Sequence, residues 1–585
     1  MGRSKIEKAR DPRGVLVRLL GYLRPFTLTL VLILILILVS SALGIVGPYL
    51  LGVAIDSFRD LAGLLRIILI MLVVYLGGWL TQVTYGYITA SVAQKALRAL
   101  RRDLFEHLQA LSLSFFDRQP HGELMSRLTN DIDAINQALS QNATQLVTSL
   151  LSVVGILIAM FVLNAWLALA TLAVFPLMVI LTLLVAKRTR KHYRKLQQNL
   201  GQLNGLMEET LSGQRVVLAF AREEATIAHF DKANVAVRDA GIRAMFYPLL
   251  IPPLMGVLSS AGIAVVAGLG GWLAIQGLAT VGTIATFITY SRRFAQPLRH
   301  LGQLYNSIQA ALAGAERVFE VIDEKPELTD APDALPLEDI AGEVIFDHVD
   351  FSYLPGVPVL KDVSLRATPG QTIALVGPTG AGKTTMINLL TRFYDIQDGS
   401  ICIDSRDIRE VQKKSLRRRL GLVLQDTFLF ANTVMENIRY GRLGATDEEC
   451  IAAAELANAD QFIRRLPQGY QTMLSERGSN LSQGQRQLLT IARAILTDPG
   501  ILILDEATSS VDTRTEVRIQ EALLRLMEGR TSFVIAHRLS TIRKADQVLV
   551  IDGGRIIEQG THEELLALGG FYHNLYMSQF KGKAA

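Results

Sequence analysis

The chain is poor in cysteine and in charged residues. It has 585 residues but only two cysteines, Cys402 and Cys450, so it cannot be built on a disulfide scaffold. No cluster of cysteine and histidine has the spacing of a zinc site. Charged residues make up only 19% of the chain and hydrophobic residues make up 50%, which excludes an intrinsically disordered protein. No collagen or solenoid repeat is present.

Charge is missing altogether from four long stretches of the first half. These stretches are residues 26–55, 67–94, 134–186 and 244–291. One crossing of the hydrocarbon core takes about 20 helical residues, so the first two stretches predict one span each and the last two predict two spans each. The breaks are expected near Asn164 and Gly277. Six spanning helices are predicted, at about 26–55, 67–94, 138–163, 165–186, 246–276 and 279–300.

Lysine and arginine are distributed unevenly between the connections. The first 25 residues hold seven, residues 95–133 hold six and residues 187–243 hold eleven, whereas the connection after the first helix holds two. The positive-inside rule therefore places both termini and the two long connections in the cytoplasm, in a multi-pass protein of the cell inner (cytoplasmic) membrane. Residues 1–325 carry a net charge of +11 and residues 326–585 carry −6. Because topology explains this excess, we expect no nucleic acid partner.

The cytoplasmic connections predict helices with breaks. Residues 187–243 are expected to break near Ser212 and Gly213, and residues 95–133 at 117–122. An apolar stripe over 15–26 predicts a helix lying along the inner membrane surface. Residues 326–340 are acidic and proline-containing, which is typical of a linker. The expected domains are thus a transmembrane domain at 1–325, a linker at 326–340 and a second domain at 341–585.

A glycine-rich motif follows a short strand in the second domain. Residues 372–376 predict the strand, and the motif fits G-x-x-x-x-G-K-[ST]. Its glycines let backbone N–H groups surround phosphate oxygens at the start of a helix. Lys383 would reach the β- and γ-phosphates of ATP, and Thr384 would bind Mg²⁺. The predicted phosphate-binding residues are Gly377, Pro378, Thr379, Gly380, Ala381, Gly382, Lys383, Thr384 and Thr385.

A second apolar strand ends in two acids. Residues 501–504 are fully apolar, as a buried parallel strand requires. Ligands bind at the carboxyl ends of such strands. We therefore expect Asp505 to hold Mg²⁺ and Glu506 to polarise the attacking water as the general base.

Residues 481–485 open a helix 23 residues before Asp505. Ser482, Gly484 and Gln485 at a helix N-terminus resemble the signature motif of ATP-binding-cassette (ABC) ATPases. The other family motifs follow in the family's order. Tyr353 matches the aromatic that stacks on adenine, Gln425 the Q-loop glutamine that also approaches Mg²⁺, Asp512 the D-loop and His537 the switch histidine at the γ-phosphate.

The resemblance covers nearly the whole chain and implies a half-transporter of the exporter type. Its fold would be an α-helical six-span transmembrane domain plus an α/β P-loop NTPase (ABC ATPase) domain. Because the family's signature faces the phosphate loop of another subunit, a second half-transporter subunit is implied, with short coupling helices at the breaks of the long connections. The expected activity is ATP-driven, multidrug-type export of amphipathic or hydrophobic compounds. A lipid flippase, a hydrophobic-peptide exporter and an ATP-gated channel are the alternatives.

One residue departs from the family pattern. Gln483 stands where the usual signature has glycine, as in some subunits of heterodimeric bacterial drug exporters. Since Glu506, His537 and Gln425 are intact, we expect a catalytically competent half, and both a homodimer and a heterodimer stay open.

The cargo is expected to be neutral or amphipathic, either a small molecule or a lipid. We expect no ionisable side chain inside the spans, which disfavours an ion or proton pathway. Candidates for lining a cavity, although each is more often packed or lipid-facing, are Met71, Trp79, Tyr85, Tyr87 and Phe246.

Overall fold

The chain forms two compact units. The computed structural model describes residues 10–425, 427–505, 512–536 and 538–578. The helical unit contains the chain up to Gln109 together with His121–Glu324, and the second unit contains Ala110–Pro120 and the chain from Lys325 onward. The short segment Ala110–Pro120 lies within the predicted transmembrane domain in sequence, yet it packs with the second unit.

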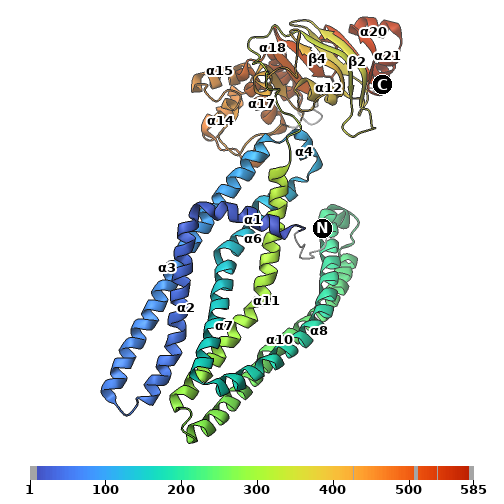
Figure 1. Ribbon diagram of the computed structural model, residues 1–585. Coiled ribbons are helices and arrows are strands. Elements are labelled where there is room, and N and C mark those ends of the chain that lie inside the picture. The colour runs from blue at the N-terminus through green and yellow to red at the C-terminus, as the bar shows by residue number, and fades with distance from the viewer. Residues whose placement is uncertain (1–9, 426, 506–511, 537, 579–585) are drawn as a thin grey trace. The chain divides into compact units, whose positions relative to one another are not determined.

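Long helices make up the helical unit, and α8 and α10 run side by side (Figure 1). The helices that the apolar stretches predict are α2 (Thr27–Asp56), α3 (Leu61–Ala110), α7 (Ala143–Leu163), α8 (Ala165–Ser212), α10 (Glu223–Ile275) and α11 (Val281–Asp323). The shorter helices are α1 (Pro12–Leu23), α5 (His121–Ser126), α6 (Ile132–Gln137) and α9 (Gln214–Ala219). A 3₁₀ turn (Arg24–Phe26) links α1 to α2, and π-helical turns (Arg127–Asp131, Ala138–Asn142) flank α6.

The breaks between helices lie where the sequence predicts them. Asn164 begins α8, and its Oδ1 accepts hydrogen bonds from the backbone N–H groups of Trp166 and Leu167, both at 3.1 Å. Gly277 takes a positive φ of 75° between α10 and α11, and Thr280 caps α11. An asparagine cap and a left-handed glycine stop one helix and start the next without a long loop.

Five helical segments of the described chain are long and apolar enough to cross a membrane. They contain α2, α3, α7, α8 and α10. The predicted sixth span, 279–300, overlaps α11, which is not among them and which carries Arg292 and Arg293. The expectation that span interiors carry no charge is therefore wrong for α11, and the sixth crossing stays a prediction.

The second unit is built on two sheets. The larger has the strand order β10-β9-β3-β8-β7-β6, with parallel pairing from β9 through to β6, and the smaller is antiparallel, in the order β2-β1-β4-β5. The strands are β1 (Val344–Phe351), β2 (Leu360–Ala367), β3 (Thr372–Val376), β4 (Asp398–Ile403), β5 (Arg406–Asp407), β6 (Leu420–Val423), β7 (Ile501–Asp505), β8 (Thr531–Ile535), β9 (Gln547–Asp552) and β10 (Arg555–Gly560).

Helices surround these sheets. They are α4 (Leu113–Arg118), α12 (Lys383–Leu390), α13 (Lys413–Arg419), α14 (Val434–Arg439), α15 (Asp447–Leu456), α16 (Asp460–Ile463), α17 (Gln483–Thr497), α18 (Thr513–Met527), α19 (Leu539–Lys544), α20 (His562–Leu568) and α21 (Phe571–Tyr576), with 3₁₀ turns at Gly469–Gln471 and Glu476–Gly478.

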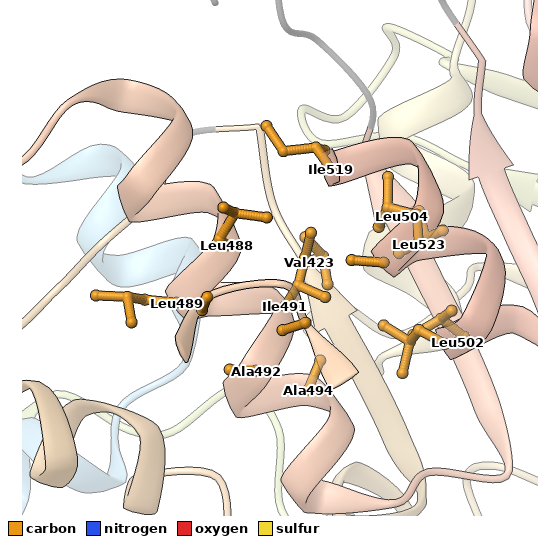
Figure 2. Packing of buried hydrophobic residues seen from close by; sticks show 14 of the residues in the cluster. Val423, Leu488, Leu489, Ile491, Ala492, Ala494, Leu502, Leu504, Ile519 and Leu523 are labelled. Atoms are coloured by element: carbon orange, nitrogen blue, oxygen red, sulfur yellow. The ribbon is translucent and has the colours of Figure 1, made fainter. Parts of the chain in front are cut away.

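The larger sheet is buried on both faces. Alternate residues of β7 point to opposite sides, with Leu502 and Leu504 in one core and Ile501 and Ile503 in the other. Figure 2 shows the first core, in which side chains of α17 and α18 pack on β6 and β7. A strand buried on both faces must be apolar throughout, which explains why residues 501–504 carry no polar side chain.

The predicted linker is extended along the second unit. Leu335 pairs with Val411 in an isolated β-bridge, and Leu328 and Leu337 are buried. The Lys413 ammonium donates to the carbonyl oxygen of Leu328. The segment 326–340 is thus fastened to the second unit by backbone pairing and buried leucines.

Candidate functional site

Four neighbouring parallel strands end at one edge of the larger sheet. The strands β3, β8, β7 and β6 pair in parallel in that order. The phosphate-loop residues follow β3, Asp505 ends β7 and Gln425 follows β6. Residues from three distant parts of the sequence therefore meet at the edge where ligands bind in such sheets. Glu506 and His537, which follow β7 and β8 in sequence, lie outside the described residues.

The phosphate loop needs glycine at two positions for lack of space. A Cβ on Gly377 would lie 2.1 Å from the carbonyl oxygen of Ile551, and one on Gly382 would lie 2.7 Å from a methyl group of Leu360. Gly382 also takes a φ of 112°, directly before α12 begins. The loop therefore folds tightly against β9 and β2, and its residues, Gly377 to Gly382, lead into the N-terminus of α12.

Lys383 is held across this loop. Its Nζ donates to the carbonyl oxygens of Gly377 at 2.7 Å and Pro378 at 2.8 Å, and the residue is only 8% exposed. Burial lowers the pKa of the Lys383 ammonium, while the nearby charge of Asp505 acts in the opposite direction. The lysine and the carboxylate at the end of β7 are thus electrostatic neighbours, as a phosphate site with a metal requires.

Oxygen donors suited to Mg²⁺ stand at the same edge. Thr384 and Gln425 are exposed and Asp505 is partly exposed. A hydroxyl, an amide oxygen and a carboxylate are hard ligands of the kind that Mg²⁺ prefers. These three predicted residues fit a magnesium ion bound together with a nucleotide.

Tyr353 reaches the first turn of α12 from the loop after β1. Its hydroxyl donates to Oγ1 of Thr385 at 3.2 Å and accepts from Nδ2 of Asn388 at 3.1 Å. The ring is 42% exposed and meets the rings of Phe351 and Tyr394 edge-to-face. An aromatic face that is partly open beside a phosphate loop can stack on a nucleotide base.

Two residues that contact Tyr353 were not predicted from the sequence. They are Asn388 and Tyr394. Asn388 lies four positions after Thr384, so both share one face of α12, and that spacing is a signal that could have found it. Tyr394 carries no comparable signal, because its place depends on the packing of the small sheet.

The signature residues form a helix cap. Ser482 begins α17, where its Oγ accepts from the backbone N–H of Gln485 at 3.3 Å, while the Gln485 side chain accepts from the backbone N–H of Ser482 at 2.9 Å. Gly484 is buried and Ser482 is exposed. This reciprocal cap leaves the helix N-terminus ordered and open to an anion.

Asp512 plays a similar role at α18. Its carboxylate accepts from the backbone N–H of Thr515 at 3.0 Å, and hydrogen bonds with Thr515 lower the pKa of Asp512. The predicted D-loop residue is therefore a charged N-cap.

The helical unit holds a polar cavity of about 410 Å³ between α2, α3, α7 and α11. Arg293 lines this cavity. It is one of the charged residues in the predicted span 279–300, which was expected to carry no charge. Of the candidate lining residues, Tyr85 borders this cavity, whereas Trp79, Tyr87 and Phe246 are exposed on the outside of the isolated unit. Met71 is partly exposed and borders neither this cavity nor the other described ones.

Two family models match the chain. The ABC transporter transmembrane region matches residues 30–298, and the ABC transporter model matches residues 360–509. The first lies in the helical unit and the second contains the phosphate loop, the signature and Asp505.

Similar proteins span the whole chain. It is 45% identical to an uncharacterized ABC transporter ATP-binding protein of Bacillus subtilis (strain 168), over 99% of this chain and 96% of the relative. It is 46% identical to a fatty acid ABC transporter ATP-binding/permease protein of Mycobacterium bovis, over 88% of this chain and 82% of the relative.

A solved structure agrees with this assignment. A bacterial Atm1-family ABC exporter with ATP bound is 32% identical, covers 94% of this chain and 98% of its own, and superposes with a TM-score of 0.74. The chain belongs to the ABC transporter family, as a membrane-embedded exporter half-transporter that binds nucleotide and couples ATP hydrolysis to transport.

Proposed function

We propose that this chain is one half of a dimeric pump that exports amphipathic, lipid-like compounds across the cytoplasmic membrane. The observation that carries the cargo class is an apolar cleft of about 180 Å³ in the helical unit, lined by side chains such as Ile33, Ile37, Val92 and Val147. A cleft of this kind takes an alkyl chain by removing apolar surface from water. The relative named as a fatty acid transporter supports a cargo of this class.

The residues at the sheet edge bind ATP and Mg²⁺ in this proposal. The loop amides and Lys383 hold the phosphates, Tyr353 stacks on the base, and Thr384, Gln425 and Asp505 bind the ion. Bound Mg²⁺ neutralises charge on the phosphates. Glu506 takes the proton of the attacking water and His537 stabilises charge at the γ-phosphate.

Two chains are needed for a complete site. Ser482, Gly484, Gln485 and Asp512 lie at the starts of α17 and α18, and in the dimer they close over the phosphate loop of the other subunit. ATP-driven closure opens the cavity outward, and hydrolysis resets it. Both termini and the nucleotide-binding units lie in the cytoplasm.

Purification of the chain tests whether the pump is a homodimer or a heterodimer. If the chain expressed alone forms a dimer with steady-state ATPase activity, the pump is a homodimer. If it is inactive alone and gains activity with a second half-transporter from the native membrane, it is a heterodimer, and Gln483 then belongs to one of two unequal ATP sites.

Transport itself is tested in proteoliposomes loaded with ATP on the side of the nucleotide-binding units. We expect labelled fatty acid, labelled phospholipid or an amphipathic drug to accumulate against its gradient, with Glu506→Gln as the inactive control. Release into the far aqueous phase indicates an exporter, and transfer confined to the opposite leaflet indicates the flippase alternative. Flux that only dissipates a gradient would contradict pumping and support the ATP-gated channel.

A further inference from the structure

The polar cavity in the helical unit has an unusual wall. It is bordered by Ser40 and Ser41 of α2, Gln82 of α3, Gln145 and Ser149 of α7, and Arg293 of α11. Hydroxyl and amide groups thus face a space of about 410 Å³ together with one cation. In the described part of the chain, no aspartate or glutamate borders this space.

No carboxylate of the described residues neutralises Arg293. Its Nη1 donates to the backbone carbonyl of Gly44 at 2.6 Å, and no described carboxylate lies within ion-pair distance of it. A guanidinium has five N–H donors, so one carbonyl leaves most of them for another partner. Cations inside membrane spans are costly and usually mark a pathway or a binding site. Arg293 lies about two thirds of the way along the predicted span 279–300.

We propose that this cavity binds the anionic headgroup of the cargo, with Arg293 as its charged contact. The inference rests on the proposed export of lipid-like compounds and names their charge. Arginine suits this role because its planar fork donates two parallel hydrogen bonds to one carboxylate or phosphate. Ser41 borders the same cavity, and its buried Oγ has no hydrogen-bond partner among the described residues.

The apolar cleft continues from this cavity along the same helices. Ile37 borders the cleft and Ser41 borders the cavity, one helical turn or about 6 Å apart on α2. The same spacing on α3 and α7 separates Tyr85 of the cavity from Thr89 of the cleft, and Thr148 of the cavity from Thr144 of the cleft. The helices therefore place a cationic polar space directly beside an apolar one. An amphiphile with one anionic head and one alkyl chain fits both at once, whereas a cationic amphiphile would place like charges together.

Arg292 provides a matched control. It is exposed and adjacent to Arg293 on α11, but it does not border the cavity, because successive helical residues point about 100° apart. The two arginines share the same helix, charge and depth, so only the orientation toward the cavity differs.

The test is a binding competition on the purified full-length protein in phosphatidylcholine nanodiscs. A fluorescent polyene fatty acid is the probe, and the competitors are palmitate, hexadecanol and hexadecyltrimethylammonium, which share one alkyl chain but differ in charge. Signal from empty nanodiscs is subtracted. We expect palmitate to compete at a concentration at least tenfold lower than either analogue, a preference that needs no variant to be measured.

Variants then assign the preference to the cavity. Arg293→Gln should remove it, Arg293→Lys should keep part of it, and Arg292→Gln should leave it unchanged. Equal competition by all three compounds, or an unaltered preference in Arg293→Gln, would overturn the proposal.

Transport assays separate this inference from the proposed function. Pumping that persists without any headgroup preference overturns only the anionic site. A palmitate preference that depends on Arg293, in a protein that pumps no amphiphile, supports the site and overturns the proposed export.

Discussion

Lys383 shows at the residue scale how the phosphate loop organises its own charge. Loop carbonyls hold the ammonium close to the start of α12, and burial lowers its pKa. A phosphate group is a stronger acceptor than these neutral carbonyls, because hydrogen bonds between charged groups are roughly twice as strong as those between neutral groups. Lys383 thus lies beside the position proposed for a phosphate group.

We predict that Lys383→Ala raises the dissociation constant for ATP at least tenfold, or about 1.4 kcal/mol. The loss follows from removing a charged donor to the phosphates. Binding of a fluorescent ATP analogue to the purified protein measures it, and the control Lys414→Ala, which changes an exposed lysine of α13, should bind normally. Unchanged affinity in Lys383→Ala would contradict the assignment.

A second residue-scale prediction concerns the loop glycines. Gly377→Ala brings a Cβ within 2.1 Å of a backbone oxygen, whereas Gly380→Ala meets no atom within 4 Å. The first change must push β9 away from the loop, while the second adds only the cost of about 1–2 kcal/mol for a left-handed alanine. Thermal unfolding of the full chain without nucleotide should show a larger loss of Tm for Gly377→Ala. A smaller loss than for Gly380→Ala would show that the loop can move freely.

At the scale of elements, α4 belongs to the second unit, although the chain before and after it belongs to the helical unit. The Tyr394 hydroxyl donates to the Asp117 carboxylate, and Arg118 forms an ion pair with Glu327. Burial and this hydrogen bond raise the pKa of Tyr394. Because α4 is continuous in the chain with α3 and α5, these contacts hold the connection between those two helices within the second unit.

We predict that Tyr394→Phe lowers the ratio of cargo-stimulated to basal ATPase activity at least twofold, because the variant keeps the ring that packs on Tyr353 and loses only the hydroxyl bonded to Asp117. The deleted hydroxyl holds α4, not the nucleotide phosphates. Tyr470→Phe is the matched control, because Tyr470 makes the same kind of bond to Asp460, at 2.8 Å, within the second unit. Equal stimulation in the wild type and in Tyr394→Phe would show that this bond does not transmit the signal.

The whole molecule works only if ATP binding and hydrolysis are separate events. Glu506, the proposed base, directly follows Asp505, the proposed magnesium ligand, in the sequence. Removing its charge should stop proton abstraction without disturbing the loop, the cap of α17 or Lys383.

We therefore predict that Glu506→Gln lowers steady-state ATP hydrolysis at least a hundredfold, within the range expected for loss of a general base. The variant should retain bound ATP and a closed dimer. Phosphate release and ATP retained after gel filtration measure the two quantities, with Glu528→Gln, an exposed glutamate after α18, as the control. Substantial turnover in Glu506→Gln would assign the base to another residue.

Local patterns determined much of this protein. A charge-free run longer than about 20 residues has few alternatives to a membrane helix, and a glycine-lysine loop after a strand binds phosphate through its own backbone. The caps at Asn164 and Ser482 and the ends of β6 and β7 follow from neighbours in sequence. The sequence accordingly predicts a nucleotide site residue by residue, and the structure adds Asn388 and Tyr394 beside Tyr353.

Tertiary structure decided what depends on residues distant in the chain. Only the packing of α2, α3, α7 and α11 places Arg293 beside serines and glutamines, and only the fold assigns Ala110–Pro120 to the ATPase unit. The charge pattern along the sequence shows only which residues neighbour a charge in the chain. The free energy of that charge depends on the groups around it in space. That is why Arg293, in a predicted span that was expected to carry no charge, lines the cavity where we place the cargo headgroup.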